Sequence, residues 1–300
     1  MANHRREPVY AYFMRWFTAI AVLSLLAPPL QAQKPLPDQQ AFLQEVRKRL
    51  DTDEDRQTGY MYMETRRMQK LDKSGNATGE SVTVLESYPP LPGEDRWERV
   101  LSEDGRPIPP QELERRDRER QKHVEEYARK LAKDPPQTKA KEDRERRRRE
   151  LSESIDDIGR VFDIRMDGRE TIEGHDAIVL TLTPRRDAKP RTSAGRIMRN
   201  FNVRAWISES DYEVVHLDAE AINTVSFGLG MLARVHKGSR ASFQRRKVNG
   251  ESWLPAFATY TVSVRVGLVA VLRRGGSVEF SNYKKFGVDS SYRIAMPDGR

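Results

Sequence analysis

Residues 161–286 carry the pattern that most constrains the fold, a succession of short runs in which apolar and polar residues alternate. Turn residues separate most of these runs, as at Glu173-Gly174 and Asn249-Gly250. Alternation with period two is typical of strands that bury one face, and short loops join strands that pair with their sequence neighbours. The pattern predicts a large antiparallel meander, and the absence of strand–helix–strand alternation argues against a doubly wound α/β fold.

The strands expected in this region cover residues 162–166, 177–183, 201–207, 212–220, 240–248, 257–266, 267–273 and 278–286. Further chain reversals are expected at Asp167-Gly168, at Ser208 to Asp211 and at Arg274-Gly275-Gly276. Gly, Asp, Asn and Ser favour these positions because they tolerate turn conformations or hydrogen-bond the turn backbone.

The part of the chain before residue 110 predicts one helix followed by strands. Asp38 stands at a helix N-cap position, and Phe42, Val46 and Leu50 recur at helical spacing, which predicts an amphipathic helix over about residues 38–51. Strand-like runs follow at 60–64, 81–88 and 96–101. Turn residues at 72–76 and at Asp104-Gly105 indicate hairpins between them.

Residues 110–158 interrupt the strand pattern with two stretches of almost continuous alternating charge. Asp134-Pro135-Pro136 separates the stretches and must end a helix. Narrow apolar stripes, such as Leu151 and Ile155 in the second stretch, predict an inserted charged helical hairpin that docks at its ends.

The predicted strands suggest a sheet with one apolar face. Alternate residues of a strand point to the same side, so each strand contributes its own apolar row. Such a face is either covered by helices or wrapped around a ligand. The residues expected to line an apolar concavity are Ile178, Leu180, Leu182, Val215, Leu217, Val262 and Val264. The alternative interpretation of each of them is plain sheet core.

The first 32 residues predict export. A basic opening leads into an uncharged run and then Gln31-Ala32, the pattern of a secretory signal peptide with cleavage near Ala32. The alternative is a retained anchor, which the interruption at Pro28-Pro29 disfavours. The remaining chain, 33–300, is expected to form a single domain in the periplasm or outside the cell, in peripheral rather than integral contact with a membrane.

No residue pattern predicts catalysis, a cofactor or a metal. The chain has no cysteine, which excludes disulfides and thiolate sites. Gly228 to Ala233 matches the dinucleotide fingerprint only superficially, because no amphipathic helix follows to hold a pyrophosphate. The histidines lack metal-ligand spacing, and His175 and His216 are expected at ordinary surface positions. The sequence therefore predicts a protein that is not an enzyme.

The densest basic patch is Arg146, Arg147, Arg148 and Arg149, within the charged insertion. It is expected either to form a solvated helix face or to contact anionic lipid head groups or an acidic partner. Without residues 1–32 the chain holds 50 Lys and Arg against 44 Asp and Glu, a balance of +6. This mild excess does not predict a nucleic-acid partner.

Three short motifs resemble the bacterial outer-membrane lipoprotein-sorting carriers, the LolA/LolB-like superfamily. Residues 202–217, which include Trp206-Ile207, resemble that superfamily's Trp-Ile-Asp hairpin, with Ser208 in place of the Asp. The segment around Gly174 is similar to its preceding strand pair, and Trp253-Leu254-Pro255 to a later hairpin. The resemblance covers residues 160–286 well and 38–101 loosely, and the insertion has no counterpart in it.

The resemblance implies an α+β fold in which an incomplete antiparallel half-barrel wraps over helices. It also implies an apolar concavity that takes the acyl chains of a lipid or lipoprotein. The leading hypothesis is an exported envelope protein that binds or transports such a ligand. The alternatives are a non-catalytic sensor or interaction module that contacts an envelope protein partner through 110–158, and, less favoured, an exported hydrolase.

Overall fold

The computed structural model of the protein describes residues 34–91, 94–133, 139–227, 233–266 and 270–285. The chain divides into two compact units, Met1–Leu36 and Pro37–Arg300, and the architecture below is that of the second unit. The expected signal peptide lies outside the described residues. In the part of the chain that is described, no helix is long and apolar enough to cross a membrane.

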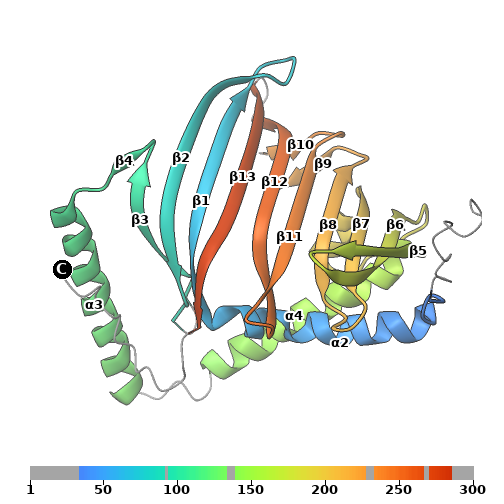
Figure 1. The fold of residues 1–300 in the computed structure, drawn as a ribbon, viewed down its shortest axis with the longest axis horizontal. Coiled ribbons are helices and arrows are strands. Elements are labelled where there is room, and N and C mark those ends of the chain that lie inside the picture. Colours follow the sequence, from blue (N-terminus) through green and yellow to red (C-terminus); the bar gives the residue numbers. More distant parts are fainter. Residues whose placement is uncertain (1–33, 92–93, 134–138, 228–232, 267–269, 286–300) are drawn as a thin grey trace, which may run out of the picture. The chain divides into compact units, whose positions relative to one another are not determined.

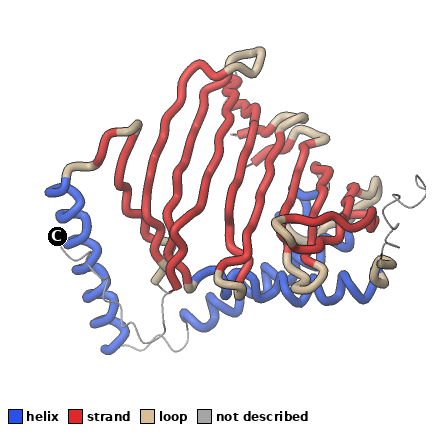
Figure 2. Tube along the Cα trace, viewed as in Figure 1, coloured by secondary structure: helices blue, strands red, loops and turns tan. Residues whose placement is uncertain are grey.

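One antiparallel sheet organises the second unit (Figures 1 and 2). Its main path runs β4-β3-β2-β1-β13-β12-β11-β8-β7-β6-β5, and β9 and β10 extend it beside β12. β4 and β5 stand at opposite ends of this path without pairing, so the sheet is open. The strands are β1 (Tyr60–Leu71), β2 (Ala77–Tyr88), β3 (Trp97–Glu103), β4 (Arg106–Pro107), β5 (Phe162–Ile172), β6 (His175–Pro184), β7 (Phe201–Ser208), β8 (Val214–Ala221), β9 (Val225–Phe227), β10 (Ala233–Val235), β11 (Arg240–Val248), β12 (Ser252–Val266) and β13 (Ala270–Lys285).

The expected α+β class with an open antiparallel sheet and helices is confirmed. The N-terminal hairpins attach to the last strand, because β1 pairs with β13 along almost its whole length. The helices are α2 (Gln39–Thr58), α3 (Pro110–Lys133), α4 (Lys139–Val161) and the short α5 (Ser193–Met198). The sheet thus unites two sequence regions that α3 and α4 separate.

Helix α2 begins as predicted but continues further. The Asp38 carboxylate accepts a hydrogen bond from the Ala41 amide at 2.8 Å and caps the helix. The predicted end at residue 51 is wrong, since the helix runs to Thr58. Its polar last turns are held by bonds such as Gln57 to Asp53 at 2.9 Å, and Asp53 also reaches Arg245 of β11.

The two helices of the insertion have different partners (Figure 1). Helix α3 lies beside β3, where the Arg99 guanidinium donates to both carboxylate oxygens of Asp117 at 2.8 and 2.9 Å. Helix α4 lies against α2, and Arg47 donates to Asp156 at 2.8 Å. The insertion therefore covers two separate regions of the domain.

Several predicted turns form with the geometry that their residues favour. Asp104-Gly105, Glu173-Gly174 and Asn249-Gly250 all have positive φ at both positions, the combination that type I′ hairpin turns require. The first hairpin turn is closed by Asp72, which accepts hydrogen bonds from the Ser74 and Asn76 amides at 2.8 and 2.9 Å.

Two predicted turns are wrong, because the chain stays in a strand at both. Asp167-Gly168 lies inside β5 at a β-bulge, where the pairing with β6 shifts between Met166 and Gly168. Gly275-Gly276 lies inside β13. Gly276 faces Tyr260 of β12, and a Cβ at Gly276 would stand 2.6 Å from the tyrosine ring. The glycine makes room for an aromatic side chain rather than reversing the chain.

The apolar core occupies both faces of β6 and β7, which corrects the expectation of a single apolar face. On one face, helix α2 and the end of α4 pack against the sheet. The cluster there consists of Phe42, Val46, Val161, Phe162, Ile178, Leu180, Leu182, Ala205 and Ile207. On the other face, Ala177, Val179, Trp206, Val215 and Trp253 pack together. His175 and His216 stack edge-on against Trp253 and Trp206 with ring centroids 5.0 and 4.5 Å apart.

Helix α4 is fastened to the loop before α5 through the fully buried Asp157. This carboxylate accepts hydrogen bonds from the Thr192 amide and hydroxyl, both at 2.7 Å, and from the Arg191 amide at 3.0 Å. Gly195 packs directly on it, and a Cβ at Gly195 would overlap the Asp157 carboxylate and stand 2.8 Å from the Cβ of Pro190.

We therefore expect Gly195→Ala to lower the free energy of unfolding by about 1–3 kcal/mol through overpacking. Chemical denaturation followed by far-UV circular dichroism measures this change. Gly159→Ala is the matched control, because a Cβ at Gly159 on α4 meets open space. An equal effect of the two substitutions would contradict the close packing of Gly195.

Candidate functional site

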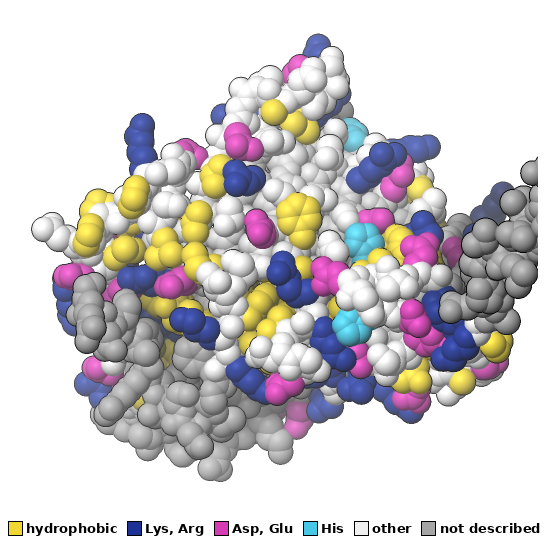
Figure 3. Space-filling view, viewed as in Figure 1, with side chains coloured by type: hydrophobic (Ala, Val, Ile, Leu, Met, Phe, Trp, Pro, Cys, Tyr) yellow, Lys and Arg dark blue, Asp and Glu magenta, His cyan; other side chains and the backbone are white. Residues whose placement is uncertain are grey.

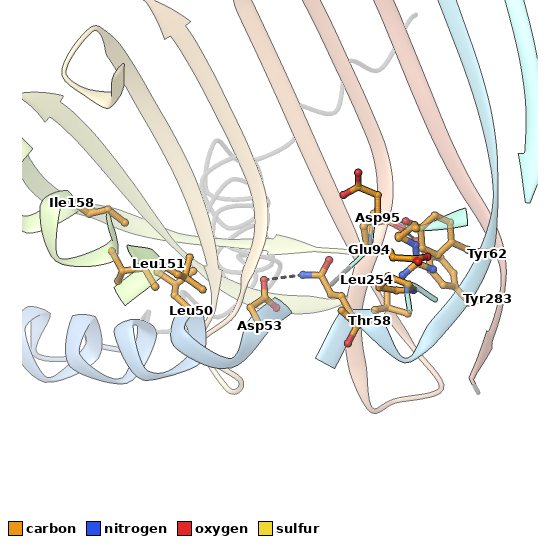
Figure 4. Close-up of a pocket in the computed structure, with 15 residues that line it drawn as sticks. Leu50, Asp53, Thr58, Tyr62, Glu94, Asp95, Leu151, Ile158, Leu254 and Tyr283 are labelled. Carbon is orange, nitrogen blue, oxygen red and sulfur yellow. Dashed lines mark hydrogen bonds between the residues drawn. The ribbon is translucent and has the colours of Figure 1, made fainter. Parts of the chain in front are cut away.

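A cavity of about 520 Å³ lies between the helices and the sheet (Figure 4). Its volume falls within the roughly 300–1,000 Å³ typical of small-molecule sites. Helices α2 and α4, the loop between β2 and β3, and strands β1, β12 and β13 all contribute to its wall. The lining residues are Leu50, Asp53, Gln57, Thr58, Tyr62, Pro90, Glu94, Asp95, Arg96, Leu151, Ile155, Ile158, Leu254, Pro255 and Tyr283.

One end of the cavity is apolar. Leu50 comes from α2, and Leu151, Ile155 and Ile158 recur at helical spacing on α4, so that one face of α4 points toward α2. Figure 4 shows Leu50, Leu151 and Ile158 gathered at this end. Leu50 and Ile158 also pack against the core cluster, whereas Leu151 and Ile155 do not belong to that cluster. These last two side chains can therefore meet a ligand without being required for the core.

The other end is aromatic and polar. The rings of Tyr62 and Tyr283 lie 5.3 Å apart, and the Arg96 guanidinium covers the Tyr62 ring at 4.5 Å. Arg96 also donates to the Ser87 hydroxyl at 2.9 Å and to the Tyr60 carbonyl. Burial raises the pKa of the Tyr283 hydroxyl far above its ordinary value, and this hydroxyl donates to the Pro255 carbonyl. Hydrogen bonds therefore fix Arg96 and Tyr283, and the Tyr283 hydroxyl stays uncharged at neutral pH.

Carboxylates stand around this polar end. Glu94 accepts from His123 of α3 at 2.6 Å and from Arg120 of α3 at 3.4 Å. Burial raises the pKa of Glu94, but the hydrogen bonds and charges of His123 and Arg120 outweigh burial and leave that pKa below its ordinary value. Asp95 is exposed to solvent. The polar end is thus joined to helix α3 through Glu94.

A buried charge cluster supports the cavity from the side of Asp53. Arg245 of β11, 2 % exposed, donates to Asp53 at 2.7 Å and to the Trp253 carbonyl at 2.6 Å. Glu213 is buried beside it and pairs with Arg56 of α2 at 3.2 Å. Burial raises the pKa of Glu213 more than Arg56 and Arg245 lower it. This cluster fixes the end of α2 to β11 and so sets the position of one cavity wall.

The predicted concavity residues lie elsewhere in the sheet. Ile178, Leu180 and Leu182 are buried in the core cluster beneath α2. Val215 lies in the cluster on the opposite face, because a bulge between Trp206 and Ile207 in the β7–β8 pairing interrupts the alternation of β8. Leu217, Val262 and Val264 are half-buried on the sheet. None of the seven is among the residues that line the cavity described above.

The predicted basic patch lies on the exposed side of α4. Arg146, Arg147, Arg148 and Arg149 are all exposed, and Arg146 pairs with Glu150 at 3.9 Å. Arg148 and Arg149 also border a smaller cavity of about 340 Å³ with Asp51, Glu145 and Ser152. The patch therefore belongs to the α2–α4 surface and not to the cavity of about 520 Å³ described above.

A second large cavity, about 660 Å³, lies on the sheet itself. Polar side chains dominate its lining, which comprises Thr181, Thr183, Asn202, Val203, Arg204, Asp218, Ala219, Glu220, Arg240, Ala241, Ser242, Thr259, Tyr260 and Thr261. No Leu or Ile side chain is among these lining residues. In the described part of the chain, no group of three or more His, Asp or Glu side chains is placed to hold a metal ion.

No protein family model matches the sequence, and no curated protein matches it. Solved structures match at low identity, among them the following three. A domain described as an outer membrane lipoprotein-sorting protein, from Vibrio parahaemolyticus, is 9% identical, with 87% of this chain and 96% of that chain covered and a TM-score of 0.34. A LolA superfamily protein from Nitrosomonas europaea is 9% identical, with 84% and 94% covered and a TM-score of 0.27. MucB of Pseudomonas aeruginosa, in complex with MucA, is 10% identical, with 82% and 99% covered and a TM-score of 0.23.

The first two of these structures carry the description of the superfamily that the hairpin motifs resemble. All three TM-scores lie below 0.5, so these likenesses assign no activity to this chain. The class of protein that the fold itself defines is an open antiparallel sheet with helices packed on it.

Proposed function

We propose that the protein is an exported, non-enzymatic envelope protein that binds an amphipathic lipid or the acyl chains of a lipoprotein between α2, α4 and the sheet. The observation that carries the proposal is the cavity's division into an apolar end of Leu and Ile side chains and a polar, aromatic end. An acyl chain suits the first end, and a hydrogen-bonding head group suits the second. The signal-like segment at residues 1–32 supports export.

We expect Leu151→Asp or Ile155→Asp to weaken binding of cis-parinaric acid at least about tenfold, because a carboxylate in the apolar end must be desolvated against the probe. The fluorescence of this fatty acid on titration measures binding. The matched control, Gly159→Asp, adds the same charge at an exposed position of α4 with open space around it. If Leu151→Asp and Ile155→Asp bound the fatty acid as tightly as the native protein, the proposal would be contradicted.

A sensor that contacts a protein partner through α3 is the second candidate, and one observation favours it. Glu94 lines the cavity and pairs with His123 and Arg120 of α3, so a ligand that displaces Glu94 also alters the contacts of this helix. Exposed charges on α3, such as Glu114 and Arg118, would then form the partner surface. Deleting the whole insertion cannot test this function, because α4 supplies part of the cavity wall.

A further inference from the structure

The charge of residues 221–278 differs from that of the rest of the chain. This segment holds one acidic residue, Glu251, in a chain that has 45. Its basic residues are Arg234, Lys237, Arg240, Arg245, Arg246, Lys247, Arg265, Arg273 and Arg274. Arg245 and Lys247 pair with Asp53 and Asp211 near the β11–β12 turn. Arg234 of β10, Arg265 near the end of β12, and Arg273 and Arg274 near the start of β13 lie at the other end of these strands from Glu251.

Strand pairing brings this basic end together. β10 pairs with β12, where Arg234 stands opposite Arg265. β12 pairs with β13, which continues to β1, where Arg274 stands opposite Lys70. Figure 1 shows these strands ending side by side, and Figure 3 shows Lys and Arg side chains on this part of the surface among apolar, other polar and acidic side chains. We call the described side chains here the docking edge: Lys70, Arg234, Val271, Leu272, Arg273 and Arg274.

The docking edge also exposes apolar side chains. Val271 is 49% and Leu272 39% exposed, and these consecutive residues point to opposite faces of β13. Arg273 and Arg274 follow directly along the strand. Apolar side chains at a tip with cations immediately behind them match a membrane interface, where apolar groups enter the acyl boundary and cations meet phosphates.

We propose that the docking edge binds the surface of an anionic lipid bilayer. Lys and Arg contact the phosphate head groups, and Val271 and Leu272 enter the boundary between head groups and acyl chains. Charge complementarity selects this occupant, because the segment that forms most of the edge is almost free of acidic residues. The proposal does not depend on what the cavity holds, since no docking-edge residue lines that cavity.

Co-sedimentation with lipid vesicles tests the proposal. The protein is used in the form in which it is purified from cells. Vesicles of phosphatidylcholine with about one third phosphatidylglycerol are compared with pure phosphatidylcholine. Arg273→Glu/Arg274→Glu is expected to weaken binding to the anionic vesicles at least about 30-fold, because each lost basic residue contributes about 1 kcal/mol at such a surface and each new carboxylate is repelled by it. Val271→Asp/Leu272→Asp is expected to weaken it similarly, and Gly159→Asp, at an exposed position of α4, to leave it unchanged.

Arg146→Glu/Arg147→Glu is the matched control, since it makes the same charge change in the exposed patch on α4. A loss of binding in this control but not in the docking-edge variants would overturn the proposal, as would equal binding to both vesicle types. The absence of cysteine allows a second readout from a single introduced thiol. An environment-sensitive dye on Val271→Cys should shift to the blue with anionic vesicles, whereas the same dye on Glu145→Cys should not. Shifts that occur with an acidic protein but not with vesicles would also overturn it.

Discussion

Replacing Arg245 with alanine is expected to lower the free energy of unfolding by about 3–5 kcal/mol, because it leaves two carboxylates near each other without their buried cation. The guanidinium is 2% exposed and donates to Asp53 at 2.7 Å and to the Trp253 and Val214 carbonyls at 2.6 and 3.2 Å. Glu213, also buried, loses the charge of Arg245 and still pairs with Arg56 at 3.2 Å.

Urea denaturation of Arg245→Ala at neutral pH measures this loss, with Arg246→Ala as the matched control. Arg246 is the next residue of the same strand and is exposed, so its removal should cost less than about 1 kcal/mol. Because Arg245 ties β11 to α2, the variant should also lose fatty-acid binding. A variant as stable as the control would contradict the assignment of Arg245 as the anchor of the cavity wall.

The cost of Arg245→Ala should shrink as the pH falls. Burial already raises the pKa of Glu213 in the folded protein, and removing Arg245 raises it further by taking away an attractive charge. A carboxyl whose folded-state pKa is raised penalises folding above that pKa, and the penalty vanishes below its unfolded value of about 4.3. The urea denaturation midpoint of Arg245→Ala should therefore approach that of the native protein as the pH is lowered toward about 4.3.

Asp157→Asn is expected to cost about 2–4 kcal/mol, because the carboxylate accepts several hydrogen bonds at a fully buried position. An amide presents its NH2 group to donors and leaves part of the set unsatisfied. The neighbouring Asp156→Asn is the matched control, since that side chain is partly exposed and pairs only at the α2–α4 surface. Equal costs would contradict the role of Asp157 as the fastening of α4.

The pH dependence of the native protein's stability should also reflect the ionisation of Asp157. Burial raises its pKa, but the donors from Thr192, Arg191 and Arg160 outweigh burial and hold the pKa at about 2. A depressed folded-state pKa gives stability that is present above the unfolded value of about 3.9 and is lost as the pH falls through about 2. This stability amounts to roughly 2.5 kcal/mol. The difference in free energy of unfolding between the native protein and Asp157→Asn should therefore narrow as the pH falls from about 3.9 to about 2. Urea denaturation at each pH measures this difference.

The open antiparallel fold could be predicted from local signals, and the errors have local physical causes. Turns such as Asn249-Gly250 depend on backbone conformations that these residues tolerate, so the sequence specifies them directly. Gly276 carries the same local signal, but it lies inside β13 because a side chain from another strand needs the space. A bulge likewise reverses the face of Val215, and no feature of β8 alone indicates it.

The cavity could not be predicted, because it is formed by segments that the fold brings together from distant parts of the sequence. Tyr283 and Tyr62 lie more than two hundred residues apart and become neighbours through the pairing of β1 with β13. The stripe of Leu151 and Ile155 was visible at helical spacing, but its partner surface was not. The strongly apolar rows of the sheet, such as Ile178 and Leu180, instead fill the core beneath α2.

Native mass spectrometry of the protein purified gently from its own envelope, followed by organic extraction, tests the proposed function most directly. Leu151→Asp purified in parallel is the control for material that adheres outside the cavity. The account predicts one stoichiometric lipid or acylated peptide on the native protein and its loss from the variant. A native protein that emerges empty, or a variant that retains the same molecule, would contradict it.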